Sequence, residues 1–573
     1  EILLNISRDN TAMSDKVKII PLGGQAEMGK NLYVIHINEK IFIVDAGFRF
    51  PESDKLGVDI IIPSFDYLKE RQDQIEGIFI THGHDDTMAA LPYLLEQINA
   101  KVYAPTLTAN LIEEMIEKHN RLNRKHIQVD LVKVKRKSDI HVAGVHIKFF
   151  PVTHSIPGSI GIAFETSEGY IVHAGEFIID FGAPDGFRTD IQTMMEIGNK
   201  GVLALMCESS YAQRTGYTSP NHKIKDKIDP IFEEATGRII VASYAQNIFR
   251  TKEIVELTKR YNRKIVFYGR DKYDNTNSIV RMGQQLKKAV IEIPKENIAF
   301  KSQIGKPEIN DQLVVLLTGT PTRIYHDISD IIDGGDDYLK INEKDTFIVV
   351  SAVVPGTEKI ATKAQNELYK TDAKVYIFKN KDLSSMHASV EDLKVMMQIF
   401  HPKYYIPIRG EYQHFIANRS IALEMGIPDE NIVIIDNGEE ITFENGELLP
   451  ERNTYEIEDV MIDGIGVGDV GMKVIDDRIQ LSNDGVVIIG MTINNQRDIV
   501  ATTDVQTRGF VYLKDSEHIV KNILKIAEDA LLEYKEQEVD NTEIRQIIKD
   551  RSYKYIVKQT GKKPVILPVI IEI

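Results

Sequence analysis

The sequence predicts an α/β protein of several domains that ends in a small α+β domain. Residues 17–105 alternate short β-rich runs with turn signals, as in NLYVIHI, KIFIVDAG and GIFITHGH. From residue 237, the strand-like GRIIVASYAQNIF is followed by the amphipathic TKEIVELTKRY and then by KIVFYGRD, which is a βαβ pattern. A chain of 573 residues is too long for one core, so two to four domains are expected.

The last part of the chain favours a linker and a separate domain. Residues 441–465 belong to a polar stretch rich in turn signals, and we interpret them as a linker. In the C-terminal domain, 466–573, the run MKVIDDRIQLSNDGVVIIGMTIN is interpreted as strands and PVILPVIIEI as a terminal strand. Between them the spacing predicts a helix over 515–537, opened by Asp515 or Ser516.

Composition narrows the class of protein. The hydrophobic content of 43% and the charged content of 27% are those of an ordinary globular protein. No apolar run reaches the roughly 18 residues of a membrane span, so no membrane association is expected. Residues 1–16 lack the pattern of a signal peptide and are interpreted as a disordered extension or a cloning remnant. The single cysteine, Cys207, excludes a disulfide framework and favours a reducing cytoplasm.

Charge alone does not decide whether the protein binds nucleic acid. The net charge of −16 argues against simple electrostatic capture of a polyanion, although an acidic protein can still contain a basic channel. Residues 117–137 are locally basic. They fit either a solvated face or a patch that follows phosphates.

Four short motifs after apolar strands contain residues that bind metals. In THGHDD, His82 and His84 are two residues apart, so an extended backbone turns both rings to one side, and Asp86 follows where a helix is expected to begin. His154 in THSIPGS and Glu176 in HAGEF are further candidates. Asp45 in IVDAG is placed to orient a ligand histidine. Imidazole and carboxylate ligands suit zinc or manganese, although each motif alone also fits a structural role.

Taken together, the motifs resemble those of a known family. LGGQAEMGKN, IVDAG, THGHDD, THSIPGS and HAGEF are similar to metallo-β-lactamase motifs. CESS, SYAQNIFR, SSMHAS and YIPIRGEY resemble motifs of the β-CASP nucleases, and TRGFVYLKDSE with KKPVILPVIIEI resembles ribonuclease J in particular. The resemblance runs from about residue 17 to the end of the chain.

This resemblance implies a fold and an activity. The fold would be a metallo-β-lactamase αββα sandwich with an inserted β-CASP α/β domain, followed by a linker and a small α+β C-terminal domain. The implied boundaries are 17–220 and 351–440 for the sandwich and 221–350 for the β-CASP domain. The family's activity is 5′→3′ exoribonuclease, with possible endonuclease action, in rRNA maturation and mRNA turnover. Expected partners are 5′-monophosphorylated RNA, a second copy or an active paralogue, and an RNA degradosome.

The family's two metal ions would not both find ligands here. The first ion maps onto His82, His84, His154 and Glu176, where glutamate replaces the family's aspartate and lengthens the side chain. The second maps onto Asp86 and onto two histidine positions that are occupied by Thr87 and Arg409. Threonine is a poor ligand, and an arginine has no lone pair to offer. We therefore expect at most one Zn²⁺ or Mn²⁺ ion, bound with reduced affinity.

The implied catalytic and substrate residues are partly retained. Glu208 and His387 map onto proton-transferring positions. The candidate substrate-binding residues are Ser384, Ser385, His387, Arg409 and Arg270. Leu383, Met386, Gln246 and Phe249 replace family residues, and residues 318–327 depart from the family's glycine-rich stretch. The pattern is similar to that of the degenerate member of the paired paralogues that many bacteria carry.

Three hypotheses follow from these departures. The first is a weak or inactive ribonuclease J paralogue that binds RNA as the partner of an active one. The second is a genuine nuclease of low activity that uses one metal ion, with Arg409 in place of the second. The third is a small-molecule metallohydrolase on the same fold, which the β-CASP motifs and the long C-terminal part disfavour.

Overall fold

The structure is a computed structural model that describes residues 14–573 except 53–54, 270–290, 322, 355–356, 465, 468–470, 511–516 and 538. The chain forms two compact units. Unit 1 consists of Glu1–Phe50 and Ile61–Val460, and unit 2 consists of Pro51–Ile60 and Met461–Ile573. Each unit is described by itself.

Unit 1 contains two large sheets packed face to face. The nine-stranded sheet has the order β20-β19-β1-β2-β3-β5-β6-β7, with β21 beside β19. Its strands are β1 (Val17–Gly23), β2 (Leu32–Ile37), β3 (Lys40–Val44), β5 (Ile75–Phe79), β6 (Val102–Pro105), β7 (Leu131–Val134), β19 (Glu439–Glu444), β20 (Glu447–Leu448) and β21 (Asn453–Thr454).

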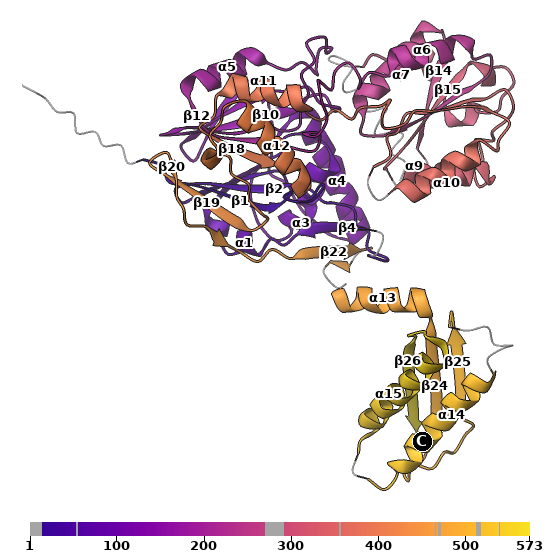
Figure 1. Cartoon of the computed structure of the whole chain (residues 1–573). Coiled ribbons are helices and arrows are strands. Elements are labelled where there is room, and N and C mark those ends of the chain that lie inside the picture. Colours follow the sequence, from indigo (N-terminus) through magenta and orange to yellow (C-terminus); the bar gives the residue numbers. More distant parts are fainter. Residues whose placement is uncertain are drawn as a thin grey trace, which may run out of the picture. The chain divides into compact units, whose positions relative to one another are not determined.

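The second sheet of this sandwich has six strands in the order β18-β12-β11-β10-β9-β8. They are β8 (Asp139–Val142), β9 (Val145–Pro151), β10 (Ile160–Thr166), β11 (Gly169–His173), β12 (Val202–Glu208) and β18 (Tyr404–Ile408). Helices α5 (Ile191–Lys200), α11 (Val390–Phe400) and α12 (Tyr412–Glu424) cover its outer face. Helices α1 (Asp66–Lys69), α3 (Leu91–Leu95) and α4 (Thr106–Asn123) cover the other sheet, which gives the predicted αββα layers (Figure 1).

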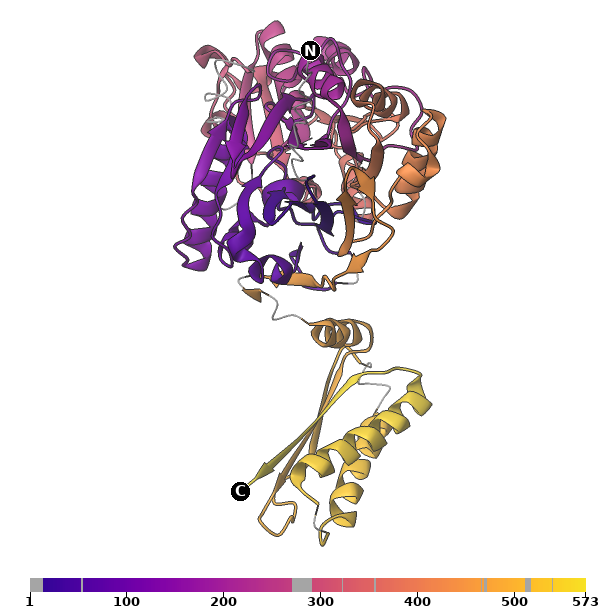
Figure 2. The same ribbon diagram turned by 90° about the vertical axis from the view of Figure 1, so that its left-hand side faces the viewer.

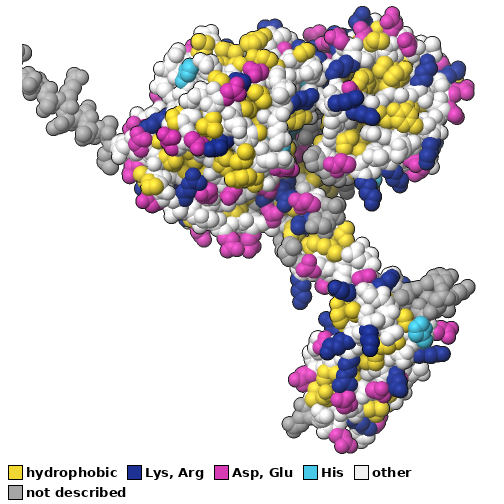
Figure 3. Space-filling model, viewed as in Figure 1, with side chains coloured by type: hydrophobic (Ala, Val, Ile, Leu, Met, Phe, Trp, Pro, Cys, Tyr) yellow, Lys and Arg dark blue, Asp and Glu magenta, His cyan; other side chains and the backbone are white. Residues whose placement is uncertain are grey.

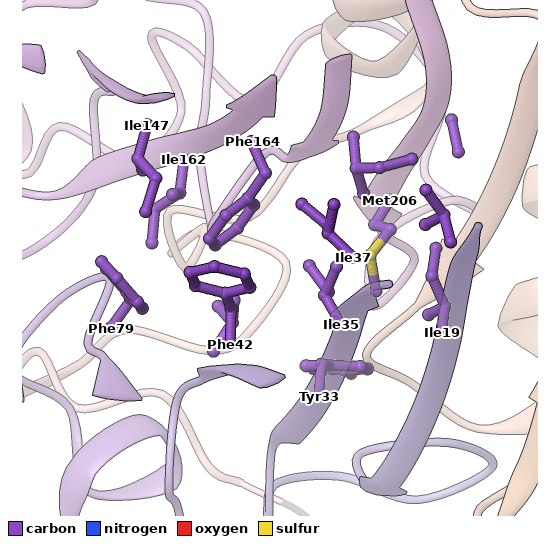
Figure 4. Packing of buried hydrophobic residues seen from close by; sticks show 14 of the residues in the cluster. Ile19, Tyr33, Ile35, Ile37, Phe42, Phe79, Ile147, Ile162, Phe164 and Met206 are labelled. Carbon is purple, nitrogen blue, oxygen red and sulfur yellow. The ribbon is translucent and has the colours of Figure 1, made fainter. Parts of the chain in front are cut away.

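Aromatic and branched side chains from both sheets fill the space between them (Figure 4). The ring centroid of Phe164 on β10 lies 5.5 Å from that of Phe42 on β3 and 5.6 Å from that of Phe79 on β5. All three side chains are fully buried. Strands with both faces covered need apolar residues at nearly every position, which explains continuous runs such as LYVIHI in β2.

A parallel five-stranded sheet forms the α/β insertion in unit 1. Its order is β14-β15-β13-β16-β17, with β13 (Ile239–Tyr244), β14 (Lys264–Gly269), β15 (Leu313–Gly319), β16 (Thr346–Val349) and β17 (Lys374–Ile377). Helices α6 (Lys225–Glu234) and α7 (Ile248–Arg260) lie on one face, and α9 (Arg323–Ile332) and α10 (Glu358–Leu368) on the other (Figure 1). Because β17 pairs in parallel with β16, this sheet extends beyond the boundary expected at residue 350.

The segment 441–465, expected to be a linker, instead contributes strands. Ile441 pairs with Ile19 and Phe443 with Val17, and these four side chains are buried. Further along, β22 (Asp459–Asp463) belongs to a three-stranded sheet with β4 (Ile60–Pro63) and β23 (Gly466–Val467). The alternation of apolar and polar residues in EEITFE is short and lies among charged residues, so the sequence predicts this strand only weakly.

Unit 2 is an α+β domain. Its sheet has the order β25-β24-β26, with β24 (Val486–Ile493), β25 (Asp504–Arg508) and β26 (Val565–Glu572). Helices α14 (Glu517–Glu533) and α15 (Asn541–Thr560) lie on the same side of this sheet (Figure 2). Asp515 and Ser516, the expected helix openers, lie outside the described residues.

One secondary-structure prediction in unit 2 was wrong. Residues 472–484, interpreted as the beginning of a strand region, form helix α13 (Met472–Asp484). The run leads directly into the β-rich GVVIIGMTIN, but Ile475 and Ile479 are four residues apart and therefore share one face of a helix.

None of the helices in the described ranges combines the length and the apolar composition that crossing a bilayer requires.

The aromatic cluster between the sheets leads to a stability prediction. Replacing Phe164 by alanine should lower the free energy of unfolding by about 3–5 kcal/mol, because the cavity is closed in by both sheets. Urea denaturation followed by circular dichroism measures this change. Phe181→Ala is the matched control, since Phe181 is 82% exposed and should change stability little. Equal effects of the two substitutions would contradict this account of the core.

Candidate metal centre and catalytic site

The candidate ligands follow the ends of three sandwich strands. His82 and His84 come after β5, and His84 is the residue that precedes helix α2 (Asp85–Met88). His154 follows β9, and Glu176 follows β11. The two facing sheets thus bring residues that are far apart in the sequence to one location.

These four side chains form a compact group of ligand atoms, all within 4.8 Å of one another. The Nε2 atom of His82 lies 3.1 Å from Nδ1 of His84 and 3.2 Å from Oε2 of Glu176. The Nε2 atom of His154 lies 3.2 Å from Nδ1 of His84 and 3.0 Å from Oε2 of Glu176. Ligands about 2.0–2.1 Å from a tetrahedral zinc ion are roughly 3.3 Å from each other, so the spacing fits one such ion.

Neighbouring groups orient the histidine rings. Nδ1 of His154 donates to the carbonyl oxygen of Met386 at 2.7 Å, which leaves the Nε2 lone pair directed at the group. Thr81 Oγ1 donates to Asp45 at 3.1 Å and accepts from Nδ1 of His82 at 2.9 Å. Asp45 was predicted to accept directly from a ligand histidine. It acts instead through the hydroxyl group of Thr81.

The protonation states also suit a cation. Burial lowers the pKa of His154 to about 4, and it lowers the pKa of His82 well below its usual value. Burial acts to raise the pKa of Glu176, but Arg409 and His82 outweigh it and hold that pKa well below the usual range. Neutral imidazoles and an ionised carboxylate are the forms that bind metal. Oε2 of Glu176 is a buried oxygen with no hydrogen-bond partner among the described residues, as expected of an atom that faces a cation site.

Thr87 and Asp86, two of the residues expected at a second ion, make other interactions. The Oγ1 hydroxyl of Thr87 lies 3.0 Å from the carbonyl oxygen of His82 and 2.9 Å from that of His84, so its hydrogen is directed at the backbone. Asp86 accepts a hydrogen bond from Asn31 at 3.2 Å and does not belong to the group of four ligands. Burial, together with the charge of Glu176, raises the pKa of Asp86 to about 6. These residues do not fit a second divalent ion.

Arg409 is a buried cation bound to two carboxylates. Its Nη1 atom donates to Oε1 of Glu176 at 2.7 Å, and its Nη2 atom donates to Oδ2 of Asp45. The side chain is only 3% exposed. Arg409 and Asp45 both adopt the left-handed backbone region, with φ of 57° and 64°. Such strain in non-glycine residues persists where the surrounding structure enforces it.

Glu208 and His387 form a second pair beside the metal ligands. Oε1 of Glu208 accepts from the backbone nitrogens of Phe177 at 2.8 Å and of Ala388 at 3.2 Å, and Oε2 lies 2.8 Å from Nδ1 of His387. Burial acts to lower the pKa of His387, but the carboxylates of Glu208 and Glu176 outweigh it and raise that pKa to about 10. At neutral pH His387 is therefore an imidazolium that can donate a proton through Nε2.

The remaining predicted substrate residues lie in different settings. Ser384 is buried, and its Oγ hydroxyl has no hydrogen-bond partner among the described residues. The backbone nitrogen of Ser385 donates to the hydroxyl of Tyr211 at 3.3 Å. Arg270 lies outside the described residues. Gln246 donates to Asp85 at 2.9 Å and so joins the insertion to the sandwich.

Sequence reasoning missed three contributors to this site. Thr81 immediately precedes His82, so its role had a local signal in ITHGH. The ring centroid of Tyr211 lies 5.4 Å from that of His387. Tyr211 directly follows the CESS motif, and nothing in the sequence marks it as a residue of the site. The carbonyl oxygen of Met386 cannot be identified from sequence, because any residue carries one.

Comparisons with known proteins agree with this architecture. Three family models match: a beta-lactamase superfamily domain at residues 42–179, the ribonuclease J beta-CASP domain at 236–368 and the ribonuclease J C-terminal domain at 473–573. A solved structure of a protein of unknown function from Enterococcus faecalis V583 matches with a TM-score of 0.50 and 14% identity, covering 75% of this chain and all of that one. At this identity the likeness concerns the fold alone.

Curated relatives cover nearly the whole chain. Ribonuclease J 2 from Staphylococcus epidermidis is 34% identical over 562 residues, which is 97% of this chain and 98% of the relative. Ribonuclease J 2 from Staphylococcus saprophyticus and from Staphylococcus aureus are each 34% identical over 559 residues, with the same coverage. Identity at this level over the full length, together with the three matching domains in the same order, shows that the chain belongs to the ribonuclease J family.

Proposed function

We propose that this protein takes part in RNA processing and decay as a ribonuclease J-type subunit that binds at most one divalent ion. Alone it hydrolyses RNA weakly or not at all, and it acts as the RNA-binding partner of an active paralogue. The observation that carries this proposal is the guanidinium group of Arg409, which is hydrogen-bonded to Asp45 and Glu176 where the family would hold a second ion.

The first ion has the better support. Three imidazoles and the carboxylate of Glu176 offer a tetrahedral set of ligands to Zn²⁺ or Mn²⁺. A bound ion of this kind would supply Lewis acidity and lower the pKa of a water molecule. Glu176 stands where the family has an aspartate, and its Oε1 atom accepts a hydrogen bond from Arg409. This hydrogen bond limits how far the longer side chain can move to coordinate an ion. Reduced metal affinity follows from that restriction.

The chain's own residues retain part of the chemistry of phosphodiester hydrolysis. His387, held by Glu208, is charged at neutral pH and is placed to protonate a leaving oxygen or to neutralise a phosphate. Ser384 and Ser385 lie two or three residues from it on the same loop and are candidates to contact phosphate oxygens. These residues support RNA binding more strongly than rapid turnover, because the two-ion clamp on the reacting phosphate is incomplete.

The one-metal nuclease that uses Arg409 as a phosphate ligand is less well supported. Both terminal nitrogens of Arg409 already bind carboxylates, and the remaining Nε donor is buried, without a hydrogen-bond partner in the described part of the chain. To bind phosphate, the guanidinium group would have to leave Asp45 or Glu176 as an unpaired buried charge, which is strongly unfavourable. A small-molecule metallohydrolase would need neither the beta-CASP domain nor the ribonuclease J C-terminal domain.

The proposed setting follows from the family. We expect 5′-monophosphorylated RNA as the substrate or ligand, in the cytoplasm. The protein would assemble as a homodimer or with an active paralogue, and it would join an RNA degradosome through that partner.

Metal content is the first prediction of the proposed function. Protein purified without chelators and reconstituted with Zn²⁺ or Mn²⁺ should bind one ion per chain, as measured by elemental mass spectrometry. His84→Ala and His154→Ala should each remove it, whereas His326→Ala, an exposed histidine on α9, should leave the stoichiometry at one. Two ions per chain in the unaltered protein would contradict the proposal.

Activity is the second prediction. With 5′-monophosphorylated RNA and Mn²⁺ or Zn²⁺, the protein should hydrolyse far more slowly than an active paralogue assayed in parallel. Any activity that belongs to this site should disappear in His84→Ala and fall in His387→Gln, which keeps a similar shape but cannot become charged. Turnover that equals the active paralogue's would refute the weak-subunit proposal, and hydrolysis that survives His84→Ala would indicate a contaminating nuclease.

The stability contributed by the buried arginine is the third prediction. Arg409→Met should destabilise the protein by about 3–5 kcal/mol, because the carboxylates of Asp45 and Glu176 would lose their buried cation. Arg419→Met is the matched control, since Arg419 pairs with Asp429 at the surface and should contribute at most about 1 kcal/mol. Urea denaturation compares the two variants, and a loss at Arg409 no greater than that at Arg419 would show that the arginine is not needed to neutralise the site.

A further inference from the structure

Unit 2 carries a row of exposed lysines along α15 and the turn after it. The α15 basic strip consists of Lys549, Lys554, Lys558 and Lys563, and all four side chains are exposed. Lys554 and Lys558 share one face of the helix, whereas Lys549 lies roughly 140° around the axis from Lys554. Figure 3 shows Lys and Arg side chains, in dark blue, gathered over this helix. Between residues 549 and 563 the sequence also contains Arg551 and Lys562 but only one acidic residue, Asp550. This local excess of positive charge occurs in a chain whose net charge is −16.

The ammonium groups of the strip have no protein partners in the described part of the chain. Arg551 is paired with Glu533 at 2.7 Å, and Nζ of Lys562 donates to the carbonyl oxygen of Phe510 at 2.7 Å. No comparable contact occurs for the four lysines of the strip, and Asp550 instead accepts from Gln546 at 2.9 Å. Arg551 and Lys562 therefore already have partners within the protein, whereas the ammonium groups of the strip remain available to a ligand.

Local helix energetics explain the strip only in part. Asp550 lies four residues before Lys554, a spacing at which opposite charges stabilise a helix. Lys554 and Lys558 are four residues apart, and like charges at this spacing destabilise a helix. The helix dipole favours a cation in the last turn, which accounts for Lys558 but not for Lys549 or Lys554. A polyanion lying along the helix would relieve this repulsion.

The other basic stretch of the sequence provides an internal comparison. In residues 117–137, three lysines form ion pairs with carboxylates: Lys125 with Glu96, Lys133 with Glu113 and Lys137 with Asp190. A surface pocket of about 500 Å³ beside this stretch is lined by Glu113, Glu114 and Glu117 among others. That stretch is partly neutralised, which favours the solvated-face interpretation. The α15 basic strip lacks such carboxylate partners among the described residues.

The strip also lies on a rigid support. Ile544, Ile548 and Ile556 of α15 are fully buried against α14 and the sheet. Asn522 of α14 donates to the hydroxyl of Tyr555 at 2.9 Å, which ties the two helices together. The lysines therefore keep a fixed spacing along the helix, and binding need not order the backbone first.

We propose that the α15 basic strip binds the phosphate backbone of RNA, as a contact area additional to the candidate metal centre. The proposal rests on the proposed RNA-binding function and assigns part of that binding to unit 2. Lysines that contact phosphates position a nucleic acid without reading its sequence. The binding should therefore be insensitive to base composition and strongly dependent on salt.

Equilibrium binding of a short, fluorescein-labelled single-stranded RNA to the full chain tests this proposal. The double variant Lys554→Ala/Lys558→Ala removes two charges while keeping good helix formers. It should bind about tenfold more weakly near 0.1 M salt, and the slope of log K against log salt should become shallower by about 1.4. Fluorescence anisotropy measures both quantities, with circular dichroism to verify the fold.

A matched control variant is available in unit 1. Lys359 and Lys363 on α10 are likewise exposed and four residues apart, so Lys359→Ala/Lys363→Ala makes the same change in charge on another helix. Its affinity and salt slope should stay close to those of the unaltered protein.

The outcomes separate this inference from the proposed function. If the unaltered protein fails to bind RNA at any salt concentration, the RNA-binding function itself is refuted. If it binds and the α15 variant behaves like the α10 control, only the assignment to the strip is overturned. Weaker binding of polyglutamate by the α15 variant, with RNA binding unchanged, would assign the strip to an acidic protein partner and also overturn it.

Discussion

The structure of the site depends on one buried ion-pair network, in which the guanidinium group of Arg409 is shared between Asp45 and Glu176. A buried cation with two carboxylates is tolerated only when each charge is neutralised and hydrogen-bonded. The network fixes Oε1 of Glu176, and this leaves Oε2 facing the histidines. It also joins the loop after β3 to the loop after β18, although the two are 364 residues apart in the chain.

The surrounding backbone is built to keep that network in place. Gly410, next to Arg409, forms isolated bridges with Gln25 and Glu27, so the β18 loop is anchored to the loop after β1. The left-handed conformations of Asp45 and Arg409 are each expected to cost of order 1–3 kcal/mol, which the packed sheets must offset. The two left-handed residues are thus a permanent cation and one of its carboxylate partners, and the guanidinium group also contacts the candidate metal ligand Glu176. A guanidinium group can neutralise carboxylates, but it does not lower the pKa of a water molecule as a bound metal ion does.

Much of the architecture could be predicted from the sequence, because hydrophobic periodicity, turn residues and short motifs are local features of the chain. The short strands of the first part and the βαβ pattern of the insertion follow from apolar runs and turn signals, whereas the αββα layers follow from the resemblance to known motifs. His82, His84, His154 and Glu176 follow from motifs after strands. The partners of Arg409 could not be predicted, since Asp45 and Glu176 are brought to it only by the tertiary fold. The predictions of a linker over 441–465 and of a strand at helix α13 were wrong. In both places strand pairing or packing overrides the local propensity of the residues.

The hydrogen bond from His154 to the carbonyl oxygen of Met386 has a consequence for how such a site can diverge. The acceptor belongs to the main chain, so any side chain at position 386 leaves it available, provided the loop keeps its path. The following residue, His387, is tied to Glu208 by the same loop. The ring orientation of His154 therefore depends on the path of this backbone and not on the identity of the side chain at position 386. The contact between His387 and Glu208, in contrast, requires both side chains.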